Sequence, residues 1–429
     1  MNYLQRTTPA AMCGSAATIF DTAVHAAISQ LTGFHLDASQ WEQAGFAIRD
    51  GGLGLRAAVA NADAAYLGSR AATRERCEAI RVGHRWDGQI PGSWISAATA
   101  RCNEVLGHAG TAGRIHSDQH ASTQTQTQVG QLVDAARVVL WEQSVPADAK
   151  CRRHAYAGPV AGKVLLATPS QTLDKHLSTA EFNLEVALRL GVDVFEGGSP
   201  RPFRGLLLDT PGRHALSCMA GGDAVFLHNS VRDLVYDFCR RGRLRPALEA
   251  NDLLQGFSLP DGRRRPADVL LCATSALPAG LPDGSRMPSN RRVALDFAVI
   301  NALGPSHWQA TFHSIGEAAS AYAEHKRRHL NTASLCEEAG LVFQPVVLTA
   351  QGAVTKEAAA LFHRIAEAVS AAEGSSPARL YEDLLERLAV LTSRANGRAV
   401  ARRLLQVGVD APLAGAAMAQ NLLRDPADF

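Results

Sequence analysis

Apolar residues recur at helical spacing in the first part of the chain. Residues 16–32 and 55–71 are rich in alanine and place apolar side chains three and four positions apart, which predicts two amphipathic helices. Gly51, Gly52 and Gly54 lie between them and predict a turn ahead of the second helix. This part is therefore expected to be helical.

The segment from 178 to 192 gives the clearest helix signal. Ser178 and Glu181 have the spacing of a capping box, and Gly191 follows the last apolar position. Between about 75 and 150 the pattern is weaker, and the polar tract 122–128 (STQTQTQ) indicates either a helix start or a mobile linker.

The pattern changes after Val231. A helix over 231–242 is followed by two apolar runs, a helix over 315–332, the apolar run 341–350 and a helical region over 356–423. Strand, strand, helix, strand, helix in that order predicts a compact α/β domain. The expected fold class is α+β, with a mainly helical N-terminal part followed by an α/β domain.

Each of the first two apolar runs contains one acidic residue beside arginines. Asp296 lies inside RRVALDFAVIN, and Asp268 enters the run of RRRPADVLLC. Burying an unpaired carboxylate costs on the order of several kcal/mol, unless the carboxylate takes up a proton and becomes neutral. Two such acids on strands suggest a shared metal ion near a polyanion.

Other interpretations of these acids stay open. Asp296 can be a buried acid that pairs with an arginine such as Arg265 or Arg292, and Asp268 can begin a strand at the surface. Mg²⁺ prefers hard oxygen ligands, commonly one or two carboxylates with phosphate and water. Glu249 lies upstream, where a third carboxylate could complete such a shell.

A cation near the carboxylates is available on the following helix. The residue two positions after Asp296 is Ala298, so the strand itself supplies no lysine. Tyr322 and Lys326 stand four apart and share one helix face. Lys326 is therefore the candidate to orient an attacking water or to stabilise transition-state charge.

Charge is nearly balanced overall but uneven along the chain. The formal net charge is +2, yet residues 240–292 hold ten arginines and no lysine against five acids. Such local basicity is typical of a nucleic-acid-binding region, while an arginine-rich solvated surface of a GC-rich genome is the alternative. The eight cysteines form no CxxC pair, which favours a reducing compartment.

Several classes find no support in the sequence. No signal peptide and no run of 18 apolar residues is present, so we expect an intracellular protein, nuclear or cytoplasmic, with no membrane partner. The segment 158–164 (GPVAGKV) lacks a spacer and the Ser or Thr of a phosphate loop. The GxSxG and HExxH motifs are absent, as is the Asp-Asp dipeptide of reverse transcriptases.

The motifs from 231 to 370 carry a family resemblance. The order LEA, RRPADV, ALDFAVINALGPS, YAEHKRRHL and GLVFQPVVLTAQGAV resembles the restriction-like endonuclease domain of site-specific non-LTR retrotransposons. That domain is a variant of the PD-(D/E)XK nuclease fold in which the lysine lies on a helix. The resemblance implies that Asp268 and Asp296 bind the metal, that Glu249 is the upstream acid, and that Lys326 is the displaced lysine, with Tyr322 beside it.

The resemblance extends upstream to a degenerate zinc knuckle over 201–230. His214, Cys218 and His228 match three ligands of that knuckle, but Arg201 and Arg204 stand where the family has two thiolates. A structural zinc site wants four nitrogen or sulfur ligands. A knuckle-shaped loop without metal is therefore favoured over residual zinc binding.

The rest of the chain resembles flanking parts of the same polyproteins, without the polymerase palm. The implied segments are a thumb-like helical segment (1–75), a mostly helical linker (76–200), the knuckle-like segment (201–230), the endonuclease domain (231–370) and C-terminal helices (371–429). The implied function is a Mg²⁺-dependent DNA endonuclease that nicks one strand at a target site. The alternative is an inactive remnant that still binds nucleic acid.

The expected partner is DNA, with RNA as a second candidate, and the sequence leaves the oligomeric state open. The arginines expected to contact the phosphate backbone are Arg263, Arg264, Arg265, Arg291, Arg292, Arg327 and Arg328.

Overall fold

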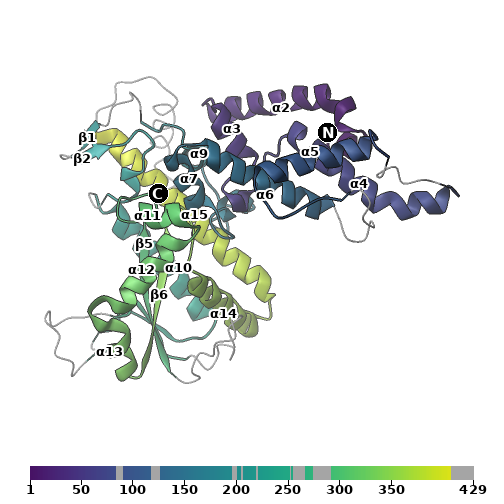
Figure 1. Cartoon of the computed structure of the whole chain (residues 1–429). Helices are drawn as coiled ribbons and strands as arrows, with labels where there is room; N and C mark the ends of the chain where they lie inside the picture. Colours follow the sequence, from purple (N-terminus) through teal and green to yellow (C-terminus); the bar gives the residue numbers. More distant parts are fainter. Residues whose placement is uncertain are drawn as a thin grey trace. The chain divides into compact units, whose positions relative to one another are not determined.

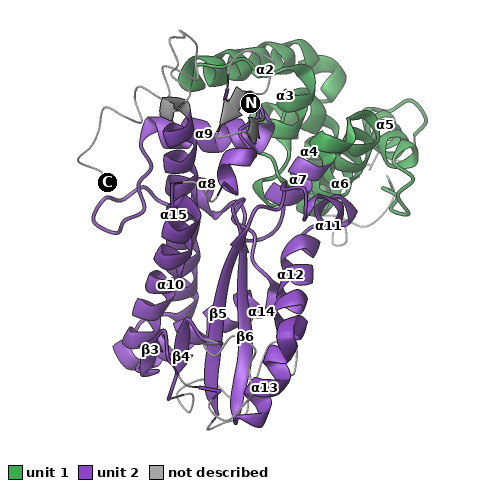
Figure 2. Ribbon diagram, turned by 90° about the vertical axis from the view of Figure 1, so that its left-hand side faces the viewer, with its two compact units in different colours: residues 1–150 green, residues 151–429 purple. Residues whose placement is uncertain are grey.

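The computed structural model divides the chain into two compact units, 1–150 and 151–429 (Figures 1 and 2). It describes residues 1–83, 90–116, 126–195, 201–203, 206–218, 221–251, 253–254, 266–273 and 291–406. The boundary at residue 150 falls inside the segment that the sequence assigned to a linker.

The described residues of the first unit form helices joined by turns and loops, with no strand among them. Its core joins the middle of α4 to α5 and α6, with Tyr66, Ile95 and Val133 among the buried side chains. The helices are α1 (Asn2–Thr7), α2 (Ala10–Thr32), α3 (Ala38–Gly45), the 3₁₀ turn η1 (Ile48–Asp50), α4 (Ala58–Ile80), α5 (Trp94–His108) and α6 (Gln126–Ser144). The helices predicted over 16–32 and 55–71 are confirmed as α2 and α4.

The turn predicted between those helices is present. Gly51 follows η1 with φ of 89°, and Gly54 has φ of 76°, in the left-handed region that glycine tolerates best. Gly52 is packed so closely that an added Cβ would lie 2.2 Å from the carbonyl oxygen of Phe46. All three glycines are therefore required by the local backbone.

Helix α2 is the one helix within the described ranges that is long and apolar enough, by length and composition alone, to cross a membrane. Its Asp21 caps a neighbouring helix: Oδ1 accepts a hydrogen bond from the backbone N–H of Ala58 at 2.7 Å, and Oδ2 accepts one from Val59 at 3.0 Å. Because these amides begin α4, they gain the acceptor that its own N-cap residue lacks. Asp21 therefore ties α2 to the start of α4.

The second unit contains a four-stranded mixed sheet in the order β3-β4-β5-β6. The strands are β3 (Pro246–Leu248), β4 (Val269–Leu271), β5 (Arg292–Ile300) and β6 (Leu341–Thr349). The first three are antiparallel neighbours, while β5 and β6 run parallel over their full length. A separate antiparallel hairpin joins β1 (Arg201–Phe203) and β2 (Leu206–Leu208).

Helices cover both faces of this sheet. The α-helices described in the second unit, apart from the two introduced at the end of this paragraph, are α7 (Ala147–Tyr156, which contains the unit boundary), α8 (Lys163–Leu166), α9 (Thr179–Leu190), α10 (Asp223–Arg241), α11 (Trp308–His313), α14 (Lys356–Glu373) and α15 (Pro377–Gln406). A 3₁₀ turn, η3 (His214–Leu216), precedes α10. Figure 2 shows α10 and α15 on one side of β5 and β6, and α12 (Glu317–Arg328) and α13 (Thr332–Glu338) on the other.

The alternation of side chains along β5 matches these two layers. Val293, Leu295 and Phe297 belong to the core cluster with α10, α14 and α15. Ala294 belongs to the smaller cluster on the other face, together with Cys336 of α13. Asp296 has the same parity as Ala294, so its side chain is directed to the α12 side of the sheet.

The α+β class is confirmed, and the strands predicted around Asp268 and Asp296 and over 341–350 are confirmed as β4, β5 and β6. The helix predicted over 315–332 is shorter, because Leu330 and Asn331 have φ of 51° and 60° and separate α12 from α13. Strand β3 has three residues, too few to give a periodic signal. The helical region predicted over 356–423 is α14 and α15 up to Gln406, and residues 407–429 lie outside the described residues.

The helix predicted over 178–192 is confirmed, together with the signals predicted at its start and at its end. The Ser178 side chain accepts a hydrogen bond from the Glu181 backbone at 3.3 Å, and the Glu181 carboxylate accepts one from the Ser178 backbone at 2.8 Å. Gly191 ends α9 in the left-handed conformation.

We expect Ser178→Ala to destabilise the first turn of α9 by about 1 kcal/mol, the usual cost of losing an N-cap. The measurement is hydrogen exchange at the Glu181 amide, which should speed up roughly fivefold. Ser178→Asp restores an acceptor and should keep the slow rate. Equal exchange in the alanine variant and the parent would contradict the assignment of this cap.

Candidate functional site

Asp268 directly precedes β4, where the antiparallel ladder with β5 ends. Val269 pairs with Leu295, and the backbone N–H of Asp268 donates to the Leu295 carbonyl at 2.9 Å. Its side-chain Oδ2 accepts the backbone N–H of Phe297 at 2.7 Å. The carboxylate thus takes the place of a ladder carbonyl and is fixed beside the middle of β5.

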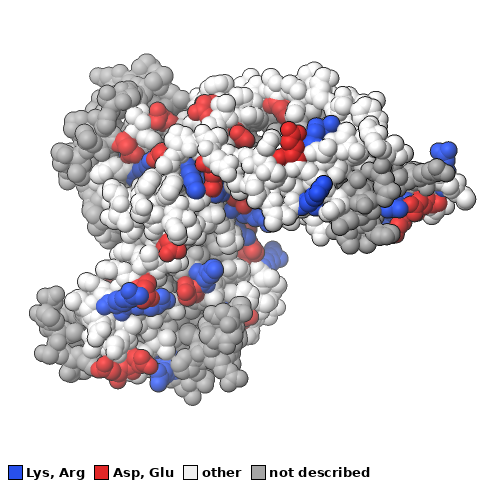
Figure 3. Space-filling model, viewed as in Figure 1, with Lys and Arg blue, Asp and Glu red and all other residues white. Residues whose placement is uncertain are grey.

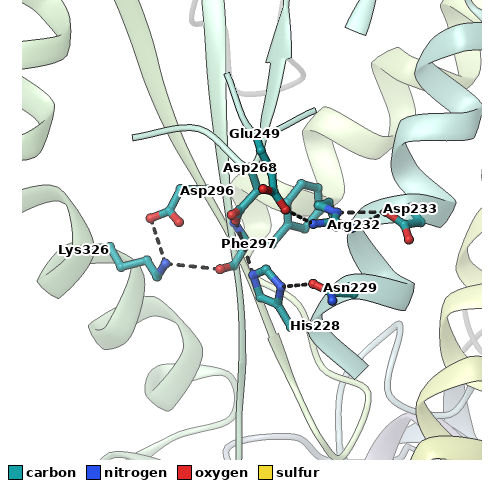
Figure 4. A network of polar contacts seen from close by, with 9 residues as sticks. All are labelled: His228, Asn229, Arg232, Asp233, Glu249, Asp268, Asp296, Phe297 and Lys326. Atoms are coloured by element: carbon teal, nitrogen blue, oxygen red, sulfur yellow. Dashed lines mark hydrogen bonds and ion pairs between the residues drawn. The ribbon is translucent and has the colours of Figure 1, made fainter. Parts of the chain in front are cut away.

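Asp296 meets a cation from α12. The Nζ of Lys326 donates to Asp296 Oδ2 at 2.7 Å and to the Phe297 carbonyl at 3.2 Å (Figure 4). The two side chains are half-buried, with 18% of Lys326 and 22% of Asp296 exposed. The lysine that the sequence placed on a helix therefore reaches the acid that the sequence placed on a strand.

The pKa of each carboxylate is shifted by its surroundings, and that of Asp296 is shifted in part by Asp268. Burial raises the pKa of Asp296, the charge and hydrogen bond of Lys326 oppose this, and the negative charge of Asp268 raises the pKa further. Burial also raises the pKa of Asp268, but hydrogen bonds from His228 and Phe297 and the charges of His228 and Lys326 outweigh burial and hold it below its ordinary value. Because their surroundings differ, the pKa of Asp296 is raised and that of Asp268 is lowered.

His228 of α10 approaches Asp268 from the other side of the sheet. Its Nε2 lies 3.3 Å from Asp268 Oδ2, and its Nδ1 lies 3.3 Å from the Asn229 side-chain oxygen. The hydrogen bond to Asp268 raises the pKa of His228, with burial acting against it. The sequence assigned His228 to a zinc knuckle and missed this contact.

Glu249 follows β3 and lies next to Asp268 along the backbone ladder. Its N–H donates to the Asp268 carbonyl at 2.8 Å, while its carboxylate pairs with Arg232 of α10 at 2.9 Å. Figure 4 shows this ion pair beside the Asp268 side chain. The structure thus brings the Glu249 backbone to the site and directs its carboxylate to an arginine.

The oxygen donors suit a hard divalent cation. Oδ1 of Asp268 and Oδ1 of Asp296 accept no hydrogen bond from any residue that the structure describes. A cation between them would relieve the repulsion that raises the pKa of Asp296. Within the described ranges no three His, Cys, Asp or Glu side chains form a ready metal-binding group, so phosphate and water oxygens would have to supply the remaining ligands.

Tyr322 lies one turn before Lys326 on α12. Its ring packs edge-on against His307, with ring centroids 5.6 Å apart, and tilts against His325 at 5.8 Å. The tyrosine therefore supports the helix next to the loop that follows β5.

The arginines expected to bind nucleic acid differ in their surroundings. Arg327 and Arg328 both pair with Glu324 on the same helix, at 3.4 Å and 2.7 Å. Arg291 and Arg292 are exposed at the start of β5, and Arg263, Arg264 and Arg265 lie outside the described residues. On the face seen in Figure 3, the lysines and arginines that the structure describes mostly lie beside acids and form no broad patch.

Among the described residues, His214, Cys218 and His228 do not form a group of three that could hold a metal ion. His214 begins η3, where its backbone N–H donates to Asp209 at 2.8 Å, and its buried Nε2 has no hydrogen-bond partner in the described parts of the chain. Cys218 is buried, and its carbonyl accepts from Arg403 at 3.1 Å. Of the two arginines at the thiolate positions, Arg201 lies in β1 and Arg204 lies outside the described residues.

Sequence reasoning missed the contacts of three residues in this network. These are His228, which contacts Asp268, Arg232, which pairs with Glu249, and Asn229, which contacts His228. A usable signal was present, because His228 and Arg232 stand four apart on a strongly amphipathic helix and share its polar margin. What the sequence lacks is the partner, since the contact depends on how α10 packs against β5.

No protein-family model matches the chain, and no curated protein is similar enough to it to count as a relative.

We expect Lys326→Met to lower the free energy of unfolding by about 1–3 kcal/mol at neutral pH, because it leaves a half-buried carboxylate without its donor. Without the lysine the folded-state pKa of Asp296 rises further above its unfolded value. Folded protein then binds that proton more tightly than unfolded protein, so the deficit grows as pH rises through the acidic range and shrinks as pH falls.

Urea unfolding in EDTA between acidic and neutral pH measures this effect. Lys326→Met combined with Asp296→Asn should recover much of the loss, and Lys356→Met, at an exposed position on α14, serves as the matched control. A deficit that stays constant with pH would show that the methionine acts through packing and not through Asp296.

Proposed function

We propose that this protein is a Mg²⁺-dependent DNA endonuclease that nicks one strand, with its site at Asp268, Asp296 and Lys326. The observation that carries the proposal is the meeting of two carboxylates from neighbouring strands with a lysine from a helix. Metal-dependent phosphodiester hydrolysis uses such groups, with hard oxygen ligands for the metal ion and a fixed positive charge near the phosphate.

The arrangement also supports a likeness to the PD-(D/E)XK nuclease fold with a lysine displaced to a helix. Asp296 lies on β5 of a small mixed sheet, Asp268 directly precedes β4, and Lys326 lies on α12, which packs against β6. In a retroelement such an enzyme would cut the target DNA inside the cell, and the arginines of 240–292 would bind its phosphates.

Lys326 has the capacity for a role in the reaction. An ammonium group has three N–H donors, and Asp296 and the Phe297 carbonyl accept two of them. The third has no acceptor among the residues that the structure describes, so it can donate to the attacking water or to a phosphate oxygen. Held in this way, Lys326 adds positive charge where the phosphate gains negative charge.

In the hydrolysis, a water oxygen forms a bond to phosphorus, the bond from phosphorus to one ester oxygen breaks, and a proton passes from the water to solvent as the leaving oxygen gains one. Asp268 and Asp296 would hold Mg²⁺, which when bound lowers the pKa of a water and offsets phosphate charge. The protein's own contribution is to engage Oδ2 of both carboxylates, while no described residue donates to Oδ1 of either.

The competing function is a folded remnant that binds nucleic acid without cutting it. The ion pairs of Arg327 and Arg328 with Glu324, and of Lys326 with Asp296, favour this alternative, because each is neutral by itself. Such a protein would retain DNA binding that weakens with salt and would show no metal requirement.

The deciding experiment incubates the purified full chain with supercoiled plasmid and MgCl₂. We expect conversion to the nicked circle by the parent, none in EDTA, and a loss of about 100-fold or more for Asp296→Ala and for Lys326→Ala, the scale for removing a charge-stabilising group. Asp237→Asn, an exposed acid on α10, is the matched control and should nick like the parent.

Equal nicking by the parent and Asp296→Ala would show that the activity is not at this site. Absence of nicking with retained plasmid binding in a gel-shift assay would establish the remnant in place of the enzyme.

A further inference from the structure

We propose that His228 is a positioning residue of the nuclease site, which fixes the Asp268 carboxylate so that Oδ1 faces the metal. The inference rests on the proposed function. It assigns a role at the cleavage site to the residue that the family resemblance assigns to zinc.

The first observation is that both internal donors of Asp268 contact one oxygen. The Phe297 amide donates to Oδ2 at 2.7 Å, and Nε2 of His228 lies 3.3 Å from the same atom. No described residue donates to Oδ1. Two donors on one oxygen fix the rotation of the carboxylate about its Cβ–Cγ bond, which one donor alone would leave freer.

The second observation is that His228 is itself held in place. Its neighbours Leu227 and Val231 are buried in the core that α10 shares with β5, which fixes the helix against the sheet. Asn229 contacts the opposite ring nitrogen at 3.3 Å and restricts the ring plane. Figure 4 shows the imidazole between Asn229 and Asp268, with Lys326 on the far side of the strand.

The third observation is that Asp268 and Asp296 are steadied from opposite layers. Lys326 reaches Asp296 from α12, and His228 reaches Asp268 from α10. Each acid then has one oxygen engaged by the protein and one to which no described residue donates. Loss of either support should change the geometry of the pair without removing a carboxylate.

The same contact opposes a zinc role for His228. Nε2 is directed at Asp268, and in the described ranges no three potential ligands gather around this histidine. Zinc ligands usually donate their second ring N–H to a carboxylate, but the remaining nitrogen here meets the Asn229 oxygen.

The test measures nicking of supercoiled plasmid across a series of MgCl₂ concentrations. His228→Ala should raise the Mg²⁺ concentration for half-maximal nicking by about 10-fold or more, the scale for losing a partner of a metal ligand. His228→Gln places an N–H donor near the position of Nε2 and should recover most of this loss. His363→Ala removes a histidine that contacts Glu367 at 3.4 Å on α14, and should leave the Mg²⁺ dependence unchanged.

Calorimetric titration of MgCl₂ into the same proteins gives a readout that does not depend on cutting. Weaker Mg²⁺ binding by His228→Ala than by the parent supports the inference even if the parent does not nick, in which case only the proposed function fails. If the parent nicks and His228→Ala has the same Mg²⁺ dependence, the inference is overturned and the function stands. Zinc that copurifies with the parent and is lost in His228→Ala would overturn it as well, because His228 would then be a zinc ligand.

Discussion

The site depends on holding two half-buried carboxylates on neighbouring strands. Each loses hydration on folding, and each repels the other, so the folded chain must supply compensating donors. Lys326 and His228 supply them from two different helices, one on each face of the sheet. The packing of α10 and α12 against β5 and β6 is thus tied to the charge balance of the pair, and neither layer alone would stabilise it.

The sequence could predict those parts that depend on local pattern. Long apolar runs identified β5 and β6, the capping box identified α9, and four-residue spacing placed Lys326 on a helix whose lysine reaches Asp296. It could not predict that Asp268 would replace a ladder carbonyl, since this depends on where the β4 ladder stops. Strand β3 is too short, at three residues, to carry a periodic signal. The kink at Leu330 is a local change of backbone conformation, which a hydrophobic pattern does not report.

The assignment of His228 shows why a matched motif does not fix a role. A histidine at a knuckle position can bind metal only where its fellow ligands converge on it. Here the two thiolates of the family pattern are replaced by arginines in the sequence, and the ring nitrogen faces a carboxylate. Helix α10 begins at Asp223, before the start predicted at residue 231. His228 therefore lies on a packed helix and not on a loop.

Structural roles alone do not account for the two negative charges. An asparagine at 268 could accept the Phe297 amide and the His228 donor through its own carbonyl oxygen, without the desolvation cost of a carboxylate. When a buried ion pair such as that between Lys326 and Asp296 is replaced by apolar side chains of similar volume, the change in stability is often neutral or favourable. A fold that needed only stability would be served as well by neutral residues at both positions. Under the proposed function, the two charges would serve to hold a divalent cation, since no described residue donates to either Oδ1 atom.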